Sequence, residues 1–267
     1  MSRVIAVTNQ KGGVGKTTTA INLAAALAVS DVKVLLIDAD PQGNTTTGLG
    51  IQKTPGLTTI YDVLVEGTEI AEAVCQSSME GLDVVPADKN LIGVNLQLVN
   101  VDDRESILSE RLKPVLANYQ FILIDCPPAL DLLTLNAMMA ADAVLVPIQC
   151  EFFALEGISE LMDTIDRIRE SFGHPIAMEG ILLTMFDDRT NLARQVAADL
   201  REFFGTDVFK TVIPRNIRLA EAPSHGKSIL AYDPGSRGAE AYIQLAKEVL
   251  TNEQKRAAKG GRTQSAG

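Results

Sequence analysis

Short apolar runs alternate with amphipathic segments along most of the chain, and this pattern predicts its fold. The runs are rich in β-branched residues and apolar at most positions, as expected of strands buried on both faces. Helical periodicity is clear at residues 17–27, 155–168 and 238–250. The predicted strands are 4–7, 33–37, 82–86, 121–124, 143–146, 181–184 and 207–210. Strands that alternate with helices predict an α/β fold: a single-domain, doubly wound, mostly parallel sheet with helices on both faces.

The middle and the end of the chain give weaker patterns. Residues 56–64 resemble a capped helix, and 91–101 and 107–116 are expected to be helices that cover the sheet. Leu91, Leu96 and Leu98 are expected in the core or in a dimer contact. Residues 254–267 are rich in Lys, Arg, Gly, Ser and Ala, a composition typical of disorder. We therefore expect one domain over residues 1–253 and a disordered basic tail over residues 254–267.

Composition narrows the class of protein. The 267 residues are 46% hydrophobic, enough for one domain with a substantial core. No apolar run approaches the roughly 18 residues of a membrane span, and the first residues do not resemble a signal peptide. Cys75, Cys126 and Cys150 are far apart and form no CxxC pair, so neither a disulfide framework nor a zinc site is indicated. We expect a soluble cytoplasmic protein in which Cys126 is a small buried residue.

The formal charge of −10 hides an asymmetry. Residues 1–183 hold 11 Lys and Arg against 24 Asp and Glu, whereas residues 184–267 hold 13 against 10. A basic final third on an acidic body could bind phosphate locally, although ordinary solvated helix faces would give the same totals.

The strongest motif follows the first predicted strand. Glycines at 12, 13 and 15 allow a tight turn whose N–H groups point at an anion, and the helix that follows begins with partial positive charge. Lys16 is expected to reach the β- and γ-phosphates of a nucleotide, and Thr17 to hold Mg²⁺. The predicted nucleotide-binding residues here are Gly12, Gly13, Val14, Gly15, Lys16, Thr17 and Thr18. The alternative is a glycine-rich turn that binds nothing.

Carboxylates follow two of the predicted strands. Asp38 and Asp40 come after 33–37, and Asp125 after 121–124, at the strand ends where open α/β sheets bind ligands. Asp125 fits a Walker B element that reaches Mg²⁺ through water. Asp38 and Asp40 could face phosphate and Mg²⁺, or could instead be turn formers or helix caps.

One departure from the standard P-loop is informative. Gln10 stands where the pattern has glycine, and Lys11 precedes the loop, giving Lys-Gly-Gly-Val-Gly-Lys-Thr at 11–17. This resembles the deviant P-loop of the ParA/MinD ATPases. The resemblance covers roughly residues 3–250 and includes DADPQGN at 38–44 and IPRNIRLAEAPSHGKSI at 213–229. Within that family the chain is most similar to the ParA/Soj chromosome-partitioning group.

The resemblance implies an ATP- and Mg²⁺-dependent homodimer with slow, switch-like hydrolysis. Lys11 would act across the dimer interface on the partner's nucleotide, together with Lys16 at its own site. Asp40 would orient the attacking water, with Asp38 supporting the Mg²⁺ shell or the first turn. Pro214 and Asn216 would lie near the adenine.

The resemblance also implies partners. Arg189, Arg218 and Lys227 match basic positions that the group uses on DNA phosphates, so binding to double-stranded DNA would be independent of sequence, and each residue could instead be a surface ion pair. A ParB-like centromere-binding protein would stimulate hydrolysis and release the DNA, which places the protein on the nucleoid. His225 is expected to be structural.

Three other functions are weighed against this one. A MinD-like membrane-positioning ATPase needs an apolar helix face at the end, but no Leu, Ile, Val, Phe or Trp follows Leu250, so no membrane partner is expected. An iron–sulfur ATPase needs bridging cysteines in a context that this chain lacks. An ATP-dependent metabolic enzyme would need a further substrate pocket. The P-loop begins so early that we expect no helix-turn-helix domain before it.

Overall fold

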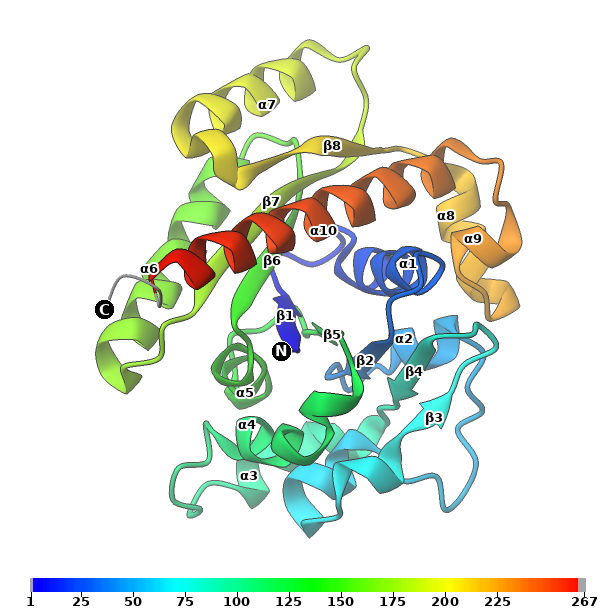
Figure 1. Ribbon diagram of the computed structural model, residues 1–267, viewed down its shortest axis with the longest axis vertical. Coiled ribbons are helices and arrows are strands. Elements are labelled where there is room, and N and C mark those ends of the chain that lie inside the picture. The colour runs from blue at the N-terminus through cyan, green and yellow to red at the C-terminus, as the bar shows by residue number, and fades with distance from the viewer. Residues whose placement is uncertain (1, 264–267) are drawn as a thin grey trace.

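The computed structural model describes residues 2–263, and an eight-stranded sheet forms its centre (Figure 1). The strand order is β3-β4-β2-β5-β1-β6-β7-β8, and every neighbouring pair is parallel except β3 and β4. The strands are β1 (Arg3–Val7), β2 (Val34–Asp38), β3 (Cys75–Gln76), β4 (Leu82–Val85), β5 (Phe121–Asp125), β6 (Ala143–Gln149), β7 (Ala177–Phe186) and β8 (Val208–Pro214). The predicted doubly wound, mostly parallel α/β sheet is confirmed.

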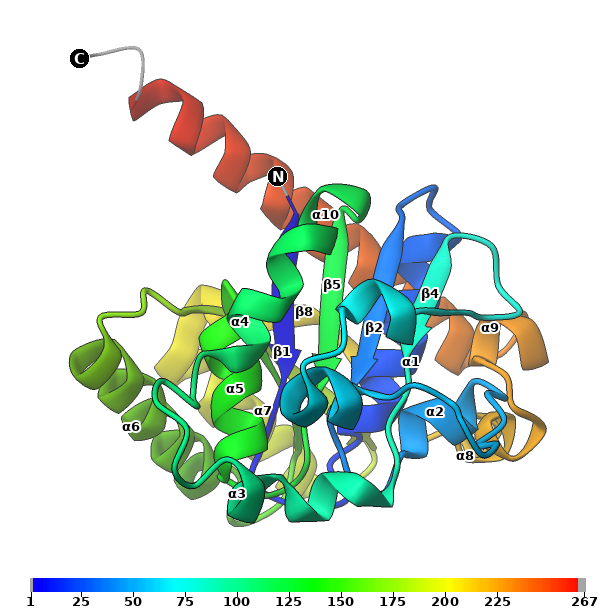
Figure 2. The ribbon, with the colours of Figure 1, turned by 90° about the horizontal axis from the view of Figure 1, so that it is seen from below.

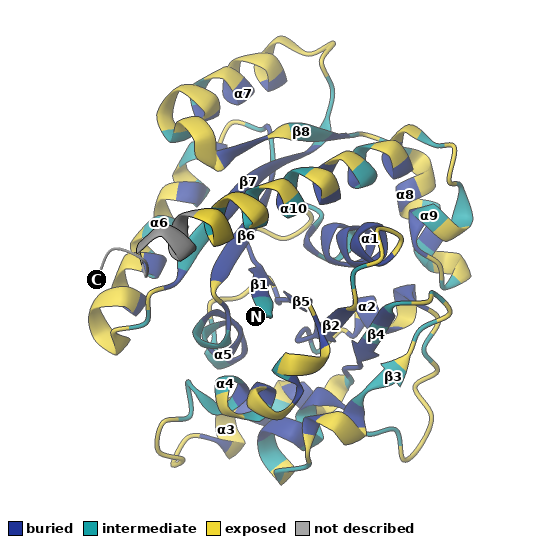
Figure 3. Ribbon diagram, viewed as in Figure 1, coloured by how far each residue is buried: buried dark blue, intermediate teal, exposed yellow. Residues whose placement is uncertain are grey.

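Helices cover both faces of the sheet (Figure 1). On one face lie α1 (Lys16–Ala28) and α10 (Arg237–Thr263), and on the other lie α5 (Leu132–Ala140), α6 (Ala154–Phe172) and α7 (Asn191–Phe204). A hydrophobic core lies on each face of the sheet, and successive residues of a strand point alternately into one core and the other. Val4 and Ala6 pack on the α5 side, and Ile5 and Val7 pack on the α1 side. This explains why the strands are apolar throughout, and α1 is itself buried almost all round (Figure 3).

The remaining elements are short. They are α2 (Asn44–Gly48), η1 (Asp62–Glu66), η2 (Ile70–Ala73), η3 (Lys89–Gly93), α3 (Val94–Gln97), α4 (Ile107–Leu112), η4 (Lys113–Asn118), η5 (Gly205–Asp207), α8 (Ile217–Glu221), η6 (Ala222–His225) and α9 (Ile229–Tyr232). The predicted helix at 56–64 is instead a π-helical turn that starts later. The predicted helices at 91–101 and 107–116 are split into short pieces, the second beside Pro114, which cannot donate a backbone hydrogen bond. Leu91 and Leu98 are in the core, whereas Leu96 is exposed.

The last strand is longer than its pattern predicts. Only residues 207–210 were expected, yet β8 continues to Pro214 because it pairs in parallel with β7 through Val212 and Pro214. The Glu248 carboxylate of α10 also accepts hydrogen bonds from the backbone N–H groups of Lys210 and Thr211.

The last helix corrects the predicted domain boundary. Residues 254–263, expected to belong to a disordered tail, continue α10, which therefore crosses residue 253 (Figure 2). The residues just beyond Leu250 include good helix formers, and Arg256 pairs with the buried carboxylate of Glu179, which also pairs with Arg3 at the start of β1. The predicted tail residues 264–267 lie outside the described residues.

Among residues 2–263, no helix is both long enough and apolar enough to cross a membrane.

Candidate functional site

The predicted phosphate loop lies between β1 and α1, at the carboxyl end of the sheet. Gly13 and Gly15 have φ of 75° and 88°, a backbone conformation that strains other residues. Two side chains outside the loop hold it in place. The Thr184 hydroxyl donates to the carbonyls of Val14 (2.7 Å) and Ile148 (3.0 Å). The Asn9 carboxamide accepts from the Lys11 N–H, 2.9 Å away.

A pocket of about 450 Å³ opens over this loop. Its walls come from six parts of the chain that are far apart in sequence: the loop with the start of α1, the turn after β2, the segment after β5, the end of β7, the end of β8 with α8, and α10. It is lined by Gly12, Gly13, Gly15, Lys16, Thr17, Thr18, Asp40, Gln42, Asn44, Pro128, Thr184, Met185, Ile213, Pro214, Asn216, Leu219, Ala220 and Tyr242. Most of the predicted nucleotide-binding residues therefore line one cavity, with Val14 buried directly behind it.

Lys16 is buried at the base of this pocket. Its Nζ donates to the Lys11 carbonyl, 3.0 Å away. Burial lowers the pKa of Lys16, and the charges of Asp125 and Asp40 oppose that shift. A phosphate in the pocket would add a stronger counter-charge to the ammonium group.

Asp38 and Asp125 end neighbouring strands and are register partners in the sheet, so both carboxylates meet beneath the pocket. Both are fully buried. Burial raises the pKa of Asp38 to about 6. Burial, and then the Asp38 charge, raises the pKa of Asp125 to about 7, against the opposing effect of the Thr45 and Thr17 hydroxyls.

The two carboxylates are bound differently. Both oxygens of Asp38 accept hydrogen bonds, Oδ1 from the Asp40 N–H and Oδ2 from the Thr46 N–H and hydroxyl. Asp125 accepts one, from the Thr45 hydroxyl to Oδ2 (2.8 Å), and the Thr17 hydroxyl is near enough to affect its pKa without hydrogen-bond geometry. Its buried Oδ1 has no hydrogen-bond partner among the described residues.

The residues present fit a magnesium ion. A buried carboxylate oxygen without a donor requires a positively charged or hydrogen-bonding neighbour, and Mg²⁺ prefers oxygen ligands. Asp125 Oδ1 and the Thr17 hydroxyl are such oxygens. Asp38, also predicted at the metal, uses both its oxygens to accept hydrogen bonds from the turn after β2 and the start of α2.

Asp40 is the acidic side chain that faces the pocket. It is 7% exposed, and its Oδ1 accepts from the Gln42 N–H, 2.9 Å away. This bond fixes the carboxylate in the turn between β2 and α2, beside Gln42 and Asn44 in the same wall.

The far end of the pocket is more apolar. Pro214 and Asn216, predicted near an adenine, lie there with Ile213 and Met185. Met185 has a φ of 47°, which is uncommon for a residue with a side chain and is characteristic of functional sites. The Asn216 side chain caps α8 by accepting from the Arg218 N–H.

Lys11 lies outside this cavity. It is exposed, and its Nζ pairs with Glu151 at 2.5 Å. Phe152 and Phe153 follow Glu151 and are 77% and 61% exposed, so Lys11 sits beside an open apolar surface.

The three predicted DNA-binding residues are exposed but are not in mutual contact. Arg189 makes a two-pronged ion pair with Asp187, which lowers the pKa of that carboxyl to about 2. Arg218 pairs with Glu221 and Asp233. Lys227 makes no ion pair within residues 2–263. His225, expected to be structural, stacks on Tyr232.

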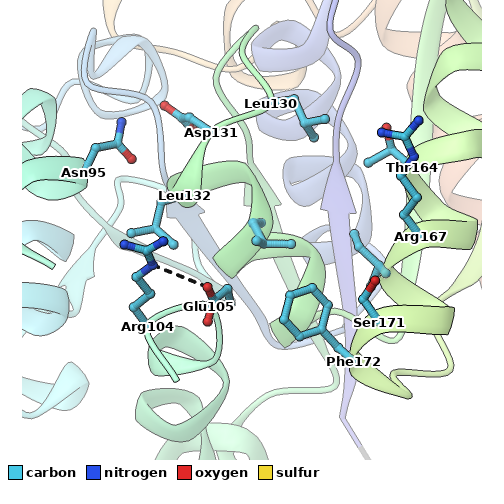
Figure 4. A pocket seen from close by; sticks show the side chains of 12 residues that line it. Asn95, Arg104, Glu105, Leu130, Asp131, Leu132, Thr164, Arg167, Ser171 and Phe172 are labelled. Carbon is cyan, nitrogen blue, oxygen red and sulfur yellow. Dashed lines mark hydrogen bonds and ion pairs between the residues drawn. The ribbon is translucent and has the colours of Figure 1, made fainter. Parts of the chain in front are cut away.

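A second cavity of about 520 Å³ lies away from the phosphate loop, between the α3–α4 region, the start of α5 and the end of α6 (Figure 4). Leucines, Ile168 and Phe172 line much of it, with Arg104 and Glu105 paired at one side. Asp131 at its edge is occupied in capping α5. It lacks the glycine-rich backbone that makes the first cavity suited to phosphate.

Sequence reasoning missed the residues that support the site. Thr45, Thr46 and Thr184 hold carboxylates or the loop through their hydroxyls, although none belongs to a recognised motif position. The available signal was the run of three threonines directly after DADPQGN. Met185 and Tyr242 line the pocket from elements whose positions only folding reveals.

Comparisons with known proteins agree with this geometry. Residues 2–178 match the AAA domain family. The chain is 53% identical to the chromosome partitioning protein ParA of Caulobacter vibrioides, covering 96% of this chain and 97% of that protein. It is 51% identical to the sporulation initiation inhibitor protein Soj of Bacillus subtilis, covering 94% and 100%. Among solved structures, cobyrinic acid a,c-diamide synthase of Mycobacterium smegmatis with bound ADP and magnesium superposes with a TM-score of 0.83 at 34% identity, covering 95% and 96%.

Proposed function

The chain belongs to the ParA/Soj family of chromosome-partitioning ATPases, and from this premise we propose that its ATP-bound homodimer binds DNA without sequence preference and releases it after hydrolysis. One observation carries the proposal. Asn216 lines the nucleotide pocket and caps α8, whose first turn presents Arg218 to solvent. The pocket-lining Asn216 is therefore two residues from a candidate DNA contact, and the two residues share a hydrogen bond.

ATP lies in the 450 Å³ pocket in this proposal. The loop from Gly12 to Thr18 binds the phosphates through its N–H groups, and Lys16 binds the β- and γ-phosphates. Pro214 and Asn216 lie against the adenine. Thr17 and Asp125 hold Mg²⁺, which when bound screens the phosphate charge, and Asp38 supports that site through the turn after β2.

Hydrolysis depends on Asp40. Its carboxylate faces the pocket from the turn between β2 and α2, where it can accept a hydrogen bond from the attacking water and orient it. Lys16 and the partner subunit's Lys11 stabilise the charge that develops on the phosphate oxygens.

In the proposed dimer, Lys11 binds the nucleotide of the partner subunit. Its exposed ammonium lies outside its own pocket and pairs with Glu151. We propose that two subunits meet across their nucleotides, where Lys11 exchanges this carboxylate for the partner's phosphates. The exposed Phe152 and Phe153 beside it supply apolar area for such an interface.

In the proposed dimer, each subunit contributes the same basic residues to DNA binding, so the number of phosphate contacts doubles. Arg189, Arg218 and Lys227 are exposed in the basic final third, and a dimer presents them twice. Six phosphate contacts predict a log–log salt slope of about −5. A ParB-like partner would accelerate hydrolysis on the nucleoid and so convert it into movement of chromosome or plasmid cargo.

The test is binding to random-sequence duplex DNA with ATP, with ADP and without nucleotide, over a salt series. Tight, salt-sensitive binding only with ATP is expected. Equal binding in all three states, or none, would overturn the proposal.

Two added arms identify the alternatives in that case. ATP-dependent binding to anionic lipid vesicles would favour a MinD-like function. Turnover that is indifferent to DNA but stimulated by a small carboxylic acid would favour a metabolic enzyme, the class to which the solved structural relative belongs by name.

A further inference from the structure

Three consecutive threonines in α2 have different surroundings. Thr45 and Thr46 are fully buried, whereas Thr47 is exposed. The Thr47 hydroxyl donates to the Gly43 carbonyl of its own helical turn, 3.0 Å away. The hydroxyls of Thr45 and Thr46 instead each donate to a buried aspartate on a different strand. Chemically identical residues on one short helix therefore have either a local or a long-range partner.

The Thr45 bond determines which Asp125 oxygen stays free. A carboxylate can rotate and exchange its two oxygens, but Oδ2 is held by the Thr45 hydroxyl at 2.8 Å. Oδ1 is left buried and, within residues 2–263, without a hydrogen-bond donor. An oxygen kept free in a dry site is costly unless a ligand satisfies it.

Thr45 itself does not line the nucleotide pocket. It lies behind Asp125, on the short helix that starts four residues after Asp40. Polar groups that hydrogen-bond a metal ligand from behind fix its orientation, and their loss typically weakens metal binding by roughly 10- to 100-fold.

We propose that Thr45 is a positioning residue that orients the Asp125 carboxylate so that Oδ1 faces the magnesium ion of the bound nucleotide. The proposal rests on the magnesium site proposed above. Thr46 acts differently, because its N–H and hydroxyl bind Asp38 while its hydroxyl also accepts from the Ala87 N–H, which ties α2 to the strand ends.

The alternative to this positioning role is that the Thr45 side chain only fills space under α2. Valine has nearly the shape of threonine but no hydroxyl, and serine keeps the hydroxyl while losing the methyl group. Thr45→Val and Thr45→Ser therefore separate the hydrogen bond from the packing. Thr47→Val removes a hydroxyl from the same helix without touching Asp125, so it is the matched control.

The experiment measures ADP affinity by calorimetry with Mg²⁺ and with EDTA, so no turnover is needed. The wild type should bind ADP more tightly with Mg²⁺. In Thr45→Val this Mg²⁺-dependent gain should fall by roughly 10-fold or more, while the affinity in EDTA stays unchanged. Thr45→Ser and Thr47→Val should keep most of the gain.

Other outcomes overturn the proposal. An unchanged gain in Thr45→Val, or equal losses with Mg²⁺ and with EDTA, would assign Thr45 to packing alone. In an Asp125→Asn background, Thr45→Val should have no further effect, because the two residues act as one unit. Thr45→Ala serves the same comparison if the valine variant does not fold. A wild type with no Mg²⁺ gain would instead reject the magnesium site itself.

Discussion

The nucleotide pocket and the three basic residues of the final third differ in how the fold holds them. Lys16, Asp38 and Asp125 are buried and bonded to backbone or hydroxyl groups of other elements. Arg189 and Arg218 are exposed and bonded to acids at most 15 residues away, and Lys227 has no such acid among the described residues. In a pre-organised site, removal of one side chain should abolish most of the binding or catalysis. On a surface of separate charges, removal of one side chain should weaken binding by only a fraction.

Lys16→Ala should have the largest effect. Removal of a buried ammonium that faces the phosphates should weaken ATP binding by at least about 100-fold, since charge-assisted hydrogen bonds are among the strongest. Lys11→Ala is the matched control, because Lys11 lies outside the pocket. Titration with a fluorescent ATP analogue should show near-normal binding for Lys11→Ala, with loss of the ATP-dependent dimer in sedimentation. Equal losses in both variants would contradict the assignment of Lys11 to the partner's site.

Asp40→Ala should reduce hydrolysis while leaving ATP binding intact. Loss of a positioned carboxylate typically lowers the rate by roughly 100-fold or more. Single-turnover hydrolysis and filter binding with ATP should show a slow enzyme that remains dimeric on DNA. Normal hydrolysis would remove Asp40 from its proposed role with the attacking water.

Changes in the basic residues should be graded. Each of Arg189→Ala, Arg218→Ala and Lys227→Ala removes two contacts per dimer, so each should make the salt slope of DNA binding shallower by about two. ATP turnover without DNA should not change. If a single substitution abolished DNA binding at every salt concentration, the three basic residues would not act as independent surface charges, and the contrast with the pre-organised nucleotide pocket would be wrong.

Gly226→Ala tests a close backbone contact next to one of the basic residues. Gly226 precedes Lys227 and has a φ of 64°, and a Cβ there would lie 2.7 Å from Cα of Gly50, two residues beyond α2. We expect a loss of about 2 kcal/mol or more in unfolding free energy, plus weaker DNA binding, because the Lys227 segment must move.

Gly173→Ala is the control for that change. Gly173 has a φ of 65° with nothing within 4 Å of its added Cβ, so this substitution should cost only the backbone strain of about 1 kcal/mol. Thermal unfolding distinguishes the two variants. Equal losses would mean that the Gly50–Gly226 contact carries no constraint.

Asp125→Asn should change the stability of the nucleotide-free protein to an extent that depends on pH. The carboxyl group ionises near 3.8 in an unfolded chain, but burial, helped by Asp38, raises its pKa to about 7 in the fold. Below pH 3.8 both states are protonated and the group costs nothing. Between pH 3.8 and 7 the unfolded state has released this proton while the folded state still holds it, so the stability of the fold decreases across that window and levels off above pH 7.

When both proteins are free of magnesium and nucleotide, the Asp125→Asn variant should therefore have a free energy of unfolding about 2 kcal/mol larger than that of the wild type at pH 8. That gain should disappear towards pH 4. Denaturant titrations at several pH values measure it. A gain that is independent of pH would show that relief of the buried charge is not its cause.

Much of the buried region could be predicted because local geometry specifies its residue types. Gly13 and Gly15 are required by their positive φ, and strands apolar on both sides had to lie between two helical layers. The middle of the chain was predicted poorly, since its short π- and 3-10-helical pieces follow packing and not a clear period. The tail was misjudged because composition alone cannot show Arg256 reaching Glu179.

The sequence alone determined the seven main parallel strands, the phosphate loop, and the strand-end aspartates, because each depends on short-range periodicity or on backbone conformations that few residues allow. Only the tertiary structure decided that Asp38 and Asp125 are register partners, that Thr45 leaves one Asp125 oxygen free, and that Gly50 touches Gly226. These relations join residues from about 80 to 180 positions apart, and parallel strand pairing and close packing, not local preference, bring such residues together.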